Sequence, residues 1–312
     1  MDMARRKTNA LKVLAVIADY RLISATQLSV YFGIKKDAIW RHIRKLLSTG
    51  AIKELQKEFG RSKGRPEAMY SLTELGIHDL RKKGILNQDP GNKFVLAENL
   101  GATTEHQLLQ NWFRLHLVYA DRQNKVLFEN IPTNSSLYWQ GSGYTDLYYY
   151  SRSFTTSKGK EITVIPDLVF RTLDPISGKS LLFFVEIDRG TENLMSPDRK
   201  HKNDIFGKIC NYLYYWDNNV YKQYEQVWNC TFKGFRVLFV ANNTKNSARL
   251  CRLVSDLGRY SNFVWVTDMP ALFNSGIGGD IWYPGGQMIE PADSILGKLA
   301  FECPIANIKY HA

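Results

Sequence analysis

The positive charge of the chain is concentrated in its first 86 residues, and this asymmetry constrains the domain organisation more than any other feature. That segment holds 18 lysines and arginines against 8 aspartates and glutamates, whereas the remaining 226 residues hold 23 against 22. A polar stretch with a Pro-Gly pair, residues 87–92, follows directly. The change in charge at this polar stretch predicts a small basic domain over residues 1–86, a linker over residues 87–100 and a larger, nearly neutral domain over residues 101–312.

The composition of the whole chain limits its class. It has 312 residues, a net charge of +11 and 44% hydrophobic residues, which is ordinary for a globular protein with a polyanionic partner. Because no apolar run is long enough for a signal peptide or a membrane span, we expect a cytoplasmic protein without membrane insertion. Four cysteines, each 20 or more residues from the next, predict neither a zinc site nor a disulfide framework.

The basic segment has the pattern of a winged helix-turn-helix. Apolar residues recur at helical spacing over residues 8–20, and Ser24 can cap a second helix that ends at Gly33. A third, basic helix is expected over residues 35–48. It is followed by a strand, a glycine-rich basic loop over residues 60–66 and a returning strand. In this arrangement the third helix enters the major groove and the loop, or wing, contacts the DNA backbone.

Nine side chains of this segment are candidate DNA contacts. The third helix is expected to turn its apolar residues inward, which leaves a basic outer face for phosphates and base edges. The candidates are Lys35, Lys36, Trp40, Arg41, Arg44 and Lys45 on the helix, and Arg61, Lys63 and Arg65 on the wing. Winged helices can also contact proteins, and that alternative stays open.

The larger domain alternates helices and strands. Helices are expected over residues 103–120, 198–215 and 248–257, and strands over residues 125–131, 161–171, 180–188, 235–241 and 262–266. This order predicts a mixed sheet flanked by helices, so the chain as a whole falls in the α/β (α+β) class.

Three carboxylates interrupt or end strands that are otherwise apolar. Alternation along residues 180–188 places Glu186 and Asp188 on one face, and hairpin pairing would bring Asp167 beside them. Such hard oxygen ligands suit Mg²⁺ or Mn²⁺, and the backbone carbonyl of Ile187 can supply a further oxygen. A metal held there would activate water and stabilise the charge that develops during phosphodiester cleavage.

The acidic pattern resembles a known motif. Pro166-Asp167, followed after 18 residues by Glu186-Ile187-Asp188, is similar to the PD-(D/E)xK motif of the restriction-endonuclease-like fold. That motif ends in lysine where this chain has Asp188. The resemblance implies Lys208, one helix later, as the substitute, because the fold lets this lysine migrate.

A wider resemblance spans about residues 10–270. A winged helix, Glu105-His106, Pro166-Asp167, the string at residues 184–192, and Lys208 with Tyr212 together resemble the replication-relaxation family, which includes MobC-type plasmid relaxases. The resemblance implies a metal-dependent endonuclease that nicks one strand at a plasmid's origin of transfer without a covalent tyrosine intermediate. The implied partners are double-stranded and locally single-stranded DNA, accessory mobilisation proteins and a coupling protein. The implied catalytic residues are Asp167, Glu186, Asp188, Lys208, Glu105 and His106.

Two rival functions stay open. Six histidines without a His-x-His pair disfavour the histidine-bound metal that accompanies a nucleophilic tyrosine in most relaxases, although 17 tyrosines leave a nucleophile available. The missing motif lysine also leaves open a non-catalytic replication initiator or transcriptional regulator with a degenerate nuclease fold.

Overall fold

The computed structural model describes residues 8–55, 67–86, 102–121, 127–130, 152–155, 161–174, 176–195 and 204–305, together with residues 308 and 310. The described residues up to Leu115 form one compact unit, and those from His116 onward form a second. Helices and strands occur in both units, which confirms the mixed α/β class expected from the sequence. Within the described ranges, no helix is long and apolar enough to cross a membrane.

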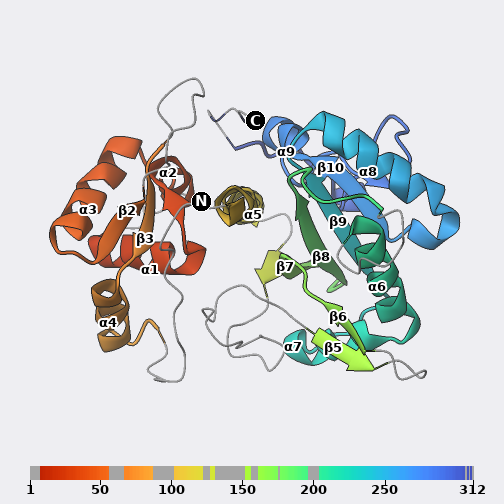
Figure 1. Cartoon of the computed structure of the whole chain (residues 1–312), viewed down its shortest axis with the longest axis horizontal. Helices are drawn as coiled ribbons and strands as arrows, with labels where there is room; N and C mark the ends of the chain where they lie inside the picture. Colours follow the sequence, from red (N-terminus) through yellow and green to blue (C-terminus); the bar gives the residue numbers. More distant parts are fainter. Residues whose placement is uncertain are drawn as a thin grey trace. The chain divides into compact units, whose positions relative to one another are not determined.

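The first unit has the order of elements of a winged helix-turn-helix (Figure 1). Its strands form an antiparallel sheet of order β1-β3-β2. Residues 56–66, where the wing is expected, lie outside the described residues. The elements are α1 (Ala10–Tyr20), β1 (Ile23–Ser24), α2 (Ala25–Phe32), α3 (Lys36–Ser48), β2 (Ile52–Leu55), β3 (Met69–Leu72) and α4 (Glu74–Lys82).

Local capping explains where the helix-turn-helix begins and turns. Ser24 Oγ accepts a hydrogen bond from the backbone N–H of Gln27, and the Gln27 side chain accepts one from the backbone N–H of Ser24. This capping box starts α2. Gly33 ends the helix at a φ of 65°, in the left-handed region that glycine adopts without steric cost. The face of α3 that is buried repeats at helical spacing and consists of Ile39, Ile43 and Leu46.

Two polar side chains anchor the first part of helix α5 (Ala102–Asp121) within the first unit. Asn111 Nδ2 donates a hydrogen bond to the carbonyl of Leu22 at 2.5 Å, and Arg114 pairs with Asp19 at 2.8 Å. Both Asn111 and Arg114 are buried, so losing these partners would leave a polar amide and a charge buried without hydrogen bonds. This half of α5, placed in the larger domain by the sequence pattern, therefore packs with the basic elements.

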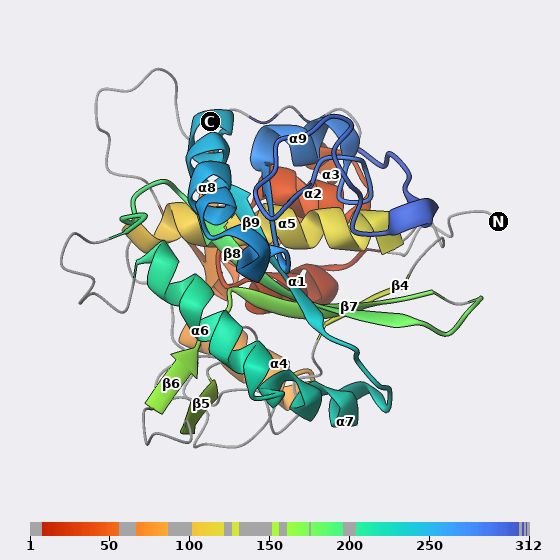
Figure 2. The same cartoon turned by 90° about the vertical axis from the view of Figure 1, so that its right-hand side faces the viewer.

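The second unit is built on a six-stranded mixed sheet of order β11-β10-β9-β8-β7-β4 (Figure 2). Strand β7 pairs antiparallel with both β4 and β8. Strand β9 pairs parallel with both β8 and β10, and β11 pairs antiparallel with β10 at the edge. The strands are β4 (Leu127–Asn130), β7 (Leu168–Leu173), β8 (Ser180–Asp188), β9 (Phe235–Ala241), β10 (Val264–Asp268) and β11 (Tyr283–Pro284). A separate antiparallel pair consists of β5 (Arg152–Thr155) and β6 (Glu161–Val164).

Helices α6 (Ile205–Asp217) and α8 (Thr244–Asp256) cover one face of this sheet (Figure 2). Their apolar side chains pack against alternate residues of β8, β9 and β10 in a single core cluster. Phe184 of β8 lies at its centre, with ring contacts to Tyr212, Tyr215 and Phe235 at centroid distances of 5.0 to 5.8 Å. The shorter helices are η1 (Val220–Tyr224), α7 (Glu225–Trp228), η2 (Gly258–Ser261), α9 (Met269–Ser275) and η3 (Gly297–Leu299).

One strand that the sequence predicts as continuous, residues 161–171, is interrupted. Its first part, β6, pairs with β5, and its second part, β7, joins the main sheet. Pro166 lies between them, and proline lacks the N–H that a strand ladder requires. Pairing resumes at Asp167, whose N–H donates to the Val185 carbonyl at 2.9 Å. The interruption sets Asp167 at the start of β7 beside β8.

His116 is a buried polar residue without a polar partner. Neither ring nitrogen has a hydrogen-bond partner among the described residues, and the ring meets Phe273 edge-on at 4.8 Å. Burial lowers the pKa of His116 to about 3, because the charged imidazolium would lose its hydration. The histidine is therefore neutral in the folded protein at neutral pH.

Replacing His116 by leucine should make the protein less sensitive to acid. Below pH 6.5 the unfolded chain takes up a proton that the buried ring refuses until about pH 3, so wild-type stability falls across this window. We compare the free energy of unfolding of His116→Leu with that of wild type at two pH values. The difference, variant minus wild type, should be about 2 kcal/mol larger at about pH 5 than at about pH 7.5. Urea titrations at both pH values measure this difference. His78→Gln, on the exposed face of α4, is the control, and parallel profiles for all three proteins would contradict the prediction.

Candidate functional site

Three acidic side chains lie together where β7 begins and β8 ends. Glu186 and Asp188 alternate onto the face of β8 that meets α6, and they are only 4% and 6% exposed. Leu168 pairs with Val185, so Asp167 lies next to Glu186 on the neighbouring strand. The backbone N–H of Ile187 donates to Asp167 Oδ2 at 2.7 Å. The hairpin thus brings the three predicted carboxylates to one end of the sheet.

Helix α6 adds two side chains that hold Glu186 from the opposite side. Lys208 Nζ lies 3.3 Å from Glu186 Oε2 and 2.9 Å from Glu192 Oε2. Tyr212, one helical turn later, donates a hydrogen bond from its hydroxyl to Glu186 Oε1 at 2.6 Å. The structure therefore places the predicted substitute lysine in contact with the acids. We name Asp167, Glu186, Asp188, Glu192, Lys208 and Tyr212 the acidic cluster.

The turn after β8 fixes Asp188 through its backbone. Asp188 Oδ1 accepts a hydrogen bond from the N–H of Gly190 at 2.7 Å. Gly190 has a φ of 75°, and a Cβ there would come within 2.0 Å of Asn246 Nδ2. Only glycine fits this close, left-handed turn. The glycine of the Val-Glu-Ile-Asp-Arg-Gly-Thr-Glu string therefore has a structural role in orienting an acid.

Burial and mutual repulsion shape the protonation of the cluster. Burial raises the pKa of Glu186 to about 7, with Lys208 opposing the effect and Asp167 adding to it. Burial also raises the pKa of Asp188, against the hydrogen bond from Gly190. Burial alone would lower the pKa of Lys208, but the charges of Glu186 and Glu192 raise it above its ordinary value. The lysine is thus the cation that offsets the buried glutamate.

The cluster suits a divalent metal in donor chemistry and in charge. Its four carboxylates face a single ammonium, and carboxylate oxygens are the ligands that Mg²⁺ and Mn²⁺ prefer. Within the described part of the chain, no three such side chains are already arranged around one point as metal ligands. Both oxygens of Glu186 are engaged, one by Lys208 and the other by Tyr212. Glu186 would have to exchange a protein partner for the ion.

Two further predicted residues lie elsewhere in the chain. Glu105 is exposed and His106 half-buried, both in the first turns of α5, and both belong to the first unit. The acidic cluster belongs wholly to the second unit. The roles of Glu105 and His106 stay predictions.

Tyr212 and Glu192 contribute to the site and belong to the motifs that carry the family resemblance, but they are not among the implied catalytic residues. The signal for Tyr212 is its spacing of four from Lys208, which places both side chains on one face of α6. The signal for Glu192 is its position four residues after Asp188. Its contact with Lys208, however, depends on the packing of α6 on β8.

The exposed face of α3 carries most of the predicted DNA contacts on the helix. Lys35, Arg41, Arg44 and Lys45 are exposed. Lys36 is also exposed, but it pairs with Glu67 at 2.6 Å and donates to Thr26 at 2.8 Å, and Trp40 packs edge-on against Tyr70 at 6.0 Å. Lys36 and Trp40 therefore also hold α3 against α2 and β3. The wing residues Arg61, Lys63 and Arg65 lie outside the described residues.

These features define an α+β protein whose first unit has the element order of a winged helix-turn-helix and whose second unit carries buried acids at the end of a mixed sheet. Residues 14–230 match the replication-relaxation family, and the chain belongs to that family. Membership indicates a role in plasmid replication or mobilisation and an interaction with DNA. The matched segment includes α3 and the whole acidic cluster. Neither a curated protein nor a solved structure matches the chain.

Removing the ammonium of Lys208 should destabilise the protein in a pH-dependent way. In Lys208→Met, Glu186 is buried without its cation, and we expect a loss of about 2 kcal/mol near pH 8.5. Near pH 5.5 the loss should be smaller, because Glu186 is then largely protonated in the folded protein with or without the lysine.

Two matched variants test this interpretation of Lys208. Glu192→Gln removes only the more exposed ion pair with Lys208 and should lower the free energy of unfolding by less than about 1 kcal/mol. Adding Glu186→Gln to Lys208→Met should restore the free energy of unfolding near pH 8.5. Urea unfolding curves of the four proteins measure these differences. If Lys208→Met loses the same free energy of unfolding at both pH values, the loss comes from changed packing and not from the missing charge.

Proposed function

We propose that this protein is a metal-dependent DNA endonuclease that nicks one strand at a plasmid's origin of transfer. The observation that supports it is the convergence of Asp167, Glu186, Asp188 and Lys208 at one end of the sheet. These are the residues of the PD-(D/E)xK-like pattern together with its displaced lysine. Family membership supports the plasmid context, and within that context we propose a MobC-type relaxase.

The topology around the acids adds support. Helix α5, strands β4, β7 and β8, helix α6 and strand β9 follow one another along the chain, with β5 and β6 inserted. Three of these strands form an antiparallel meander, and β9 lies parallel beside β8. This order resembles the core of the restriction-endonuclease-like fold, in which the acids lie at the same place.

In this proposal each member of the cluster has a distinct task. Asp167, Glu186 and Asp188, with the carbonyl of Ile187, would hold Mg²⁺ or Mn²⁺. A bound divalent ion lowers the pKa of its water and stabilises charge on the phosphate. Lys208 would donate to the phosphate when Glu186 binds the ion, because its ammonium lies within reach of that carboxylate. Tyr212 positions Glu186.

Hydrolysis fits the cluster better than attack by tyrosine. The tyrosine within the cluster, Tyr212, is 1% exposed and donates a hydrogen bond from its hydroxyl to Glu186. Burial, together with the charge of Glu186, raises its pKa well above 10. A phenol in that state is a poor nucleophile and cannot reach a DNA strand.

DNA binding by α3 predicts a defined response to salt. Arg41→Ala and Arg44→Ala should each weaken duplex binding and reduce the slope of log affinity against log salt by about 0.9. Lys36→Ala should have a smaller effect on that slope, because Lys36 is paired with Glu67. Fluorescence anisotropy with a labelled duplex over a range of salt concentrations measures these slopes.

The control for this set is Lys82→Ala, which removes an exposed cation from α4. Its slope should equal that of wild type. If the slope of Arg44→Ala also equals that of wild type, α3 is not the face that meets the phosphates.

Nicking is tested with supercoiled plasmid that carries the cognate origin, in Mg²⁺ or Mn²⁺. Wild type should convert it to open circle, whereas Asp167→Asn and Glu186→Gln should lower the rate by at least about 100-fold through loss of a charged ligand. Asp280→Asn, an exposed acid of the same unit, is the matched control and should nick normally. Equal nicking by all four proteins would contradict the assignment of the cluster, and protein left attached to the cut strand would indicate a covalent tyrosine.

A second candidate function is a DNA-binding replication initiator or regulator without catalysis. The specific observation in its favour is that Lys208 and Tyr212 already satisfy both oxygens of Glu186. If wild type shifts the plasmid in a gel and never opens it with either metal, this candidate replaces the first.

A further inference from the structure

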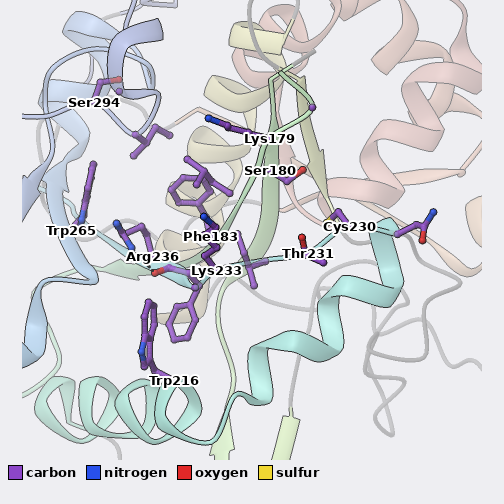
Figure 3. A pocket seen from close by; sticks show the side chains of 18 residues that line it. Lys179, Ser180, Phe183, Trp216, Cys230, Thr231, Lys233, Arg236, Trp265 and Ser294 are labelled. Carbon is purple, nitrogen blue, oxygen red and sulfur yellow. Dashed lines mark hydrogen bonds between the residues drawn. The ribbon is translucent and has the colours of Figure 1, made fainter. Parts of the chain in front are cut away.

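A cavity with a mixed polar and apolar lining lies in the larger unit, at the end of the sheet opposite to the acids. It has a volume of about 900 Å³ and is lined where β8 and β9 begin, with β10 forming one wall (Figure 3). A cavity of this size is in the range that holds small organic ligands. We name it the basic pocket and define it by Lys179, Trp216, Cys230, Lys233, Arg236 and Trp265.

The lining has charge of one sign only. It includes three cations, Lys179, Lys233 and Arg236, and none of its eighteen residues is an aspartate or a glutamate. Residues 87–312 as a whole hold 23 basic and 22 acidic residues. The pocket is thus a local concentration of positive charge in a nearly neutral part of the chain, which favours an anionic ligand.

In one part of the pocket, the cation of Arg236 lies beside the aromatic ring of Trp265. They lie side by side from neighbouring strands, with the guanidinium 5.6 Å from the centre of the tryptophan ring (Figure 3). Arg236 donates a hydrogen bond to the Phe235 carbonyl, and no described carboxylate pairs with it. Burial lowers the pKa of Arg236, so an anion beside it would offset the cost of its lost hydration. A cation next to an aromatic face is the combination that holds a base and its phosphate.

The basic pocket is distinct from the acidic cluster. Ser180 to Phe183 line it at the start of β8, whereas Glu186 and Asp188 lie at the end of the same strand. Phe183 and Glu186 are three positions apart on the strand, which corresponds to about 10 Å. Lys233, Arg236 and Trp265 also lie beyond residue 230, where the match to the replication-relaxation family ends.

We propose that the basic pocket binds a nucleotide unit of a single DNA strand, with a base against Trp265 and its phosphates at Lys179, Lys233 and Arg236. A base within a duplex has both faces covered by its neighbours in the stack, so only an unpaired strand can present a face to Trp265. Binding at the pocket requires no cleavage and no metal, and it therefore goes beyond the nicking proposal.

The partly buried Cys230 in the pocket wall provides a local readout. Wild-type protein in EDTA is alkylated with and without a short oligothymidylate, and the modified peptides are quantified by mass spectrometry. We expect the oligonucleotide to slow modification of Cys230 at least about threefold. Cys210 on α6 is half-buried like Cys230 but lies outside the lining, so its rate of alkylation should not change.

Charge and stacking variants test the recognition itself. Lys233→Glu changes an exposed residue and should weaken oligothymidylate binding about tenfold or more, and Trp265→Leu should do the same by removing the stacking surface. Arg252→Glu, an exposed cation on α8 outside the lining, makes the same kind of charge change and should bind as wild type. Fluorescence anisotropy in EDTA measures all four affinities, and thermal melting confirms that the variants are folded.

Several results would overturn the proposal. One is an unchanged Cys230 rate at saturating oligothymidylate, and another is wild-type affinity in Lys233→Glu. Equal protection by free thymidine monophosphate at the same nucleotide concentration would show a mononucleotide site and not a strand site. If oligothymidylate no longer protects Cys230 in the variant Arg44→Ala, binding requires α3. Because EDTA removes divalent metal, failure of the nicking assay has no bearing on these outcomes.

Discussion

The buried carboxylate of Glu186 is the constraint around which the larger unit is arranged. A carboxylate at 4% exposure has lost its water, and Lys208 and Tyr212 of α6 replace that hydration with an ion pair and a hydrogen bond. Both contacts require α6 to lie on β8 in one register. The ring contacts between Phe184 and the tyrosines of α6 fix that register from the apolar side. The polar site therefore depends on the core beside it, and a variant that shifts α6 would disturb the acids without touching them.

Features that depend on neighbours in the sequence could be predicted from the sequence. Ser24 and Gly33 mark the ends of α2 because capping acts within four residues, and the strand over residues 235–241 has the bounds expected from its composition. The convergence of Asp167 with Glu186 also follows from local rules. Alternation sets the face of each acid, and a short turn at residues 174–178 sets the register of the hairpin.

Features that depend on packing between distant elements could not be predicted from the sequence. No local pattern shows that Lys36 pairs with Glu67, because 31 residues separate them and only the fold brings α3 to the start of β3. The division of α5 between the two units has the same origin, since Asn111 and Arg114 find their partners near the end of α1. The lining of the basic pocket comes from residues 178 to 297, so its one-sided charge becomes visible only when the strands are placed side by side.

The near-zero net charge of residues 87–312 conceals two opposite local fields, and their separation decides whether they cancel. Leu182 at the pocket and Asp188 at the cluster are six residues apart on β8, which corresponds to about 20 Å. The Debye length at physiological ionic strength is about 8 Å, so salt weakens the interaction between the two groups of charges across that distance, although less than for fully exposed charges because Glu186 and Asp188 are buried. A DNA strand would be attracted at one end and repelled at the other. In the proposed function, a divalent ion in the acidic cluster would offset the charge of its carboxylates and so reduce the repulsion of a DNA strand at that end.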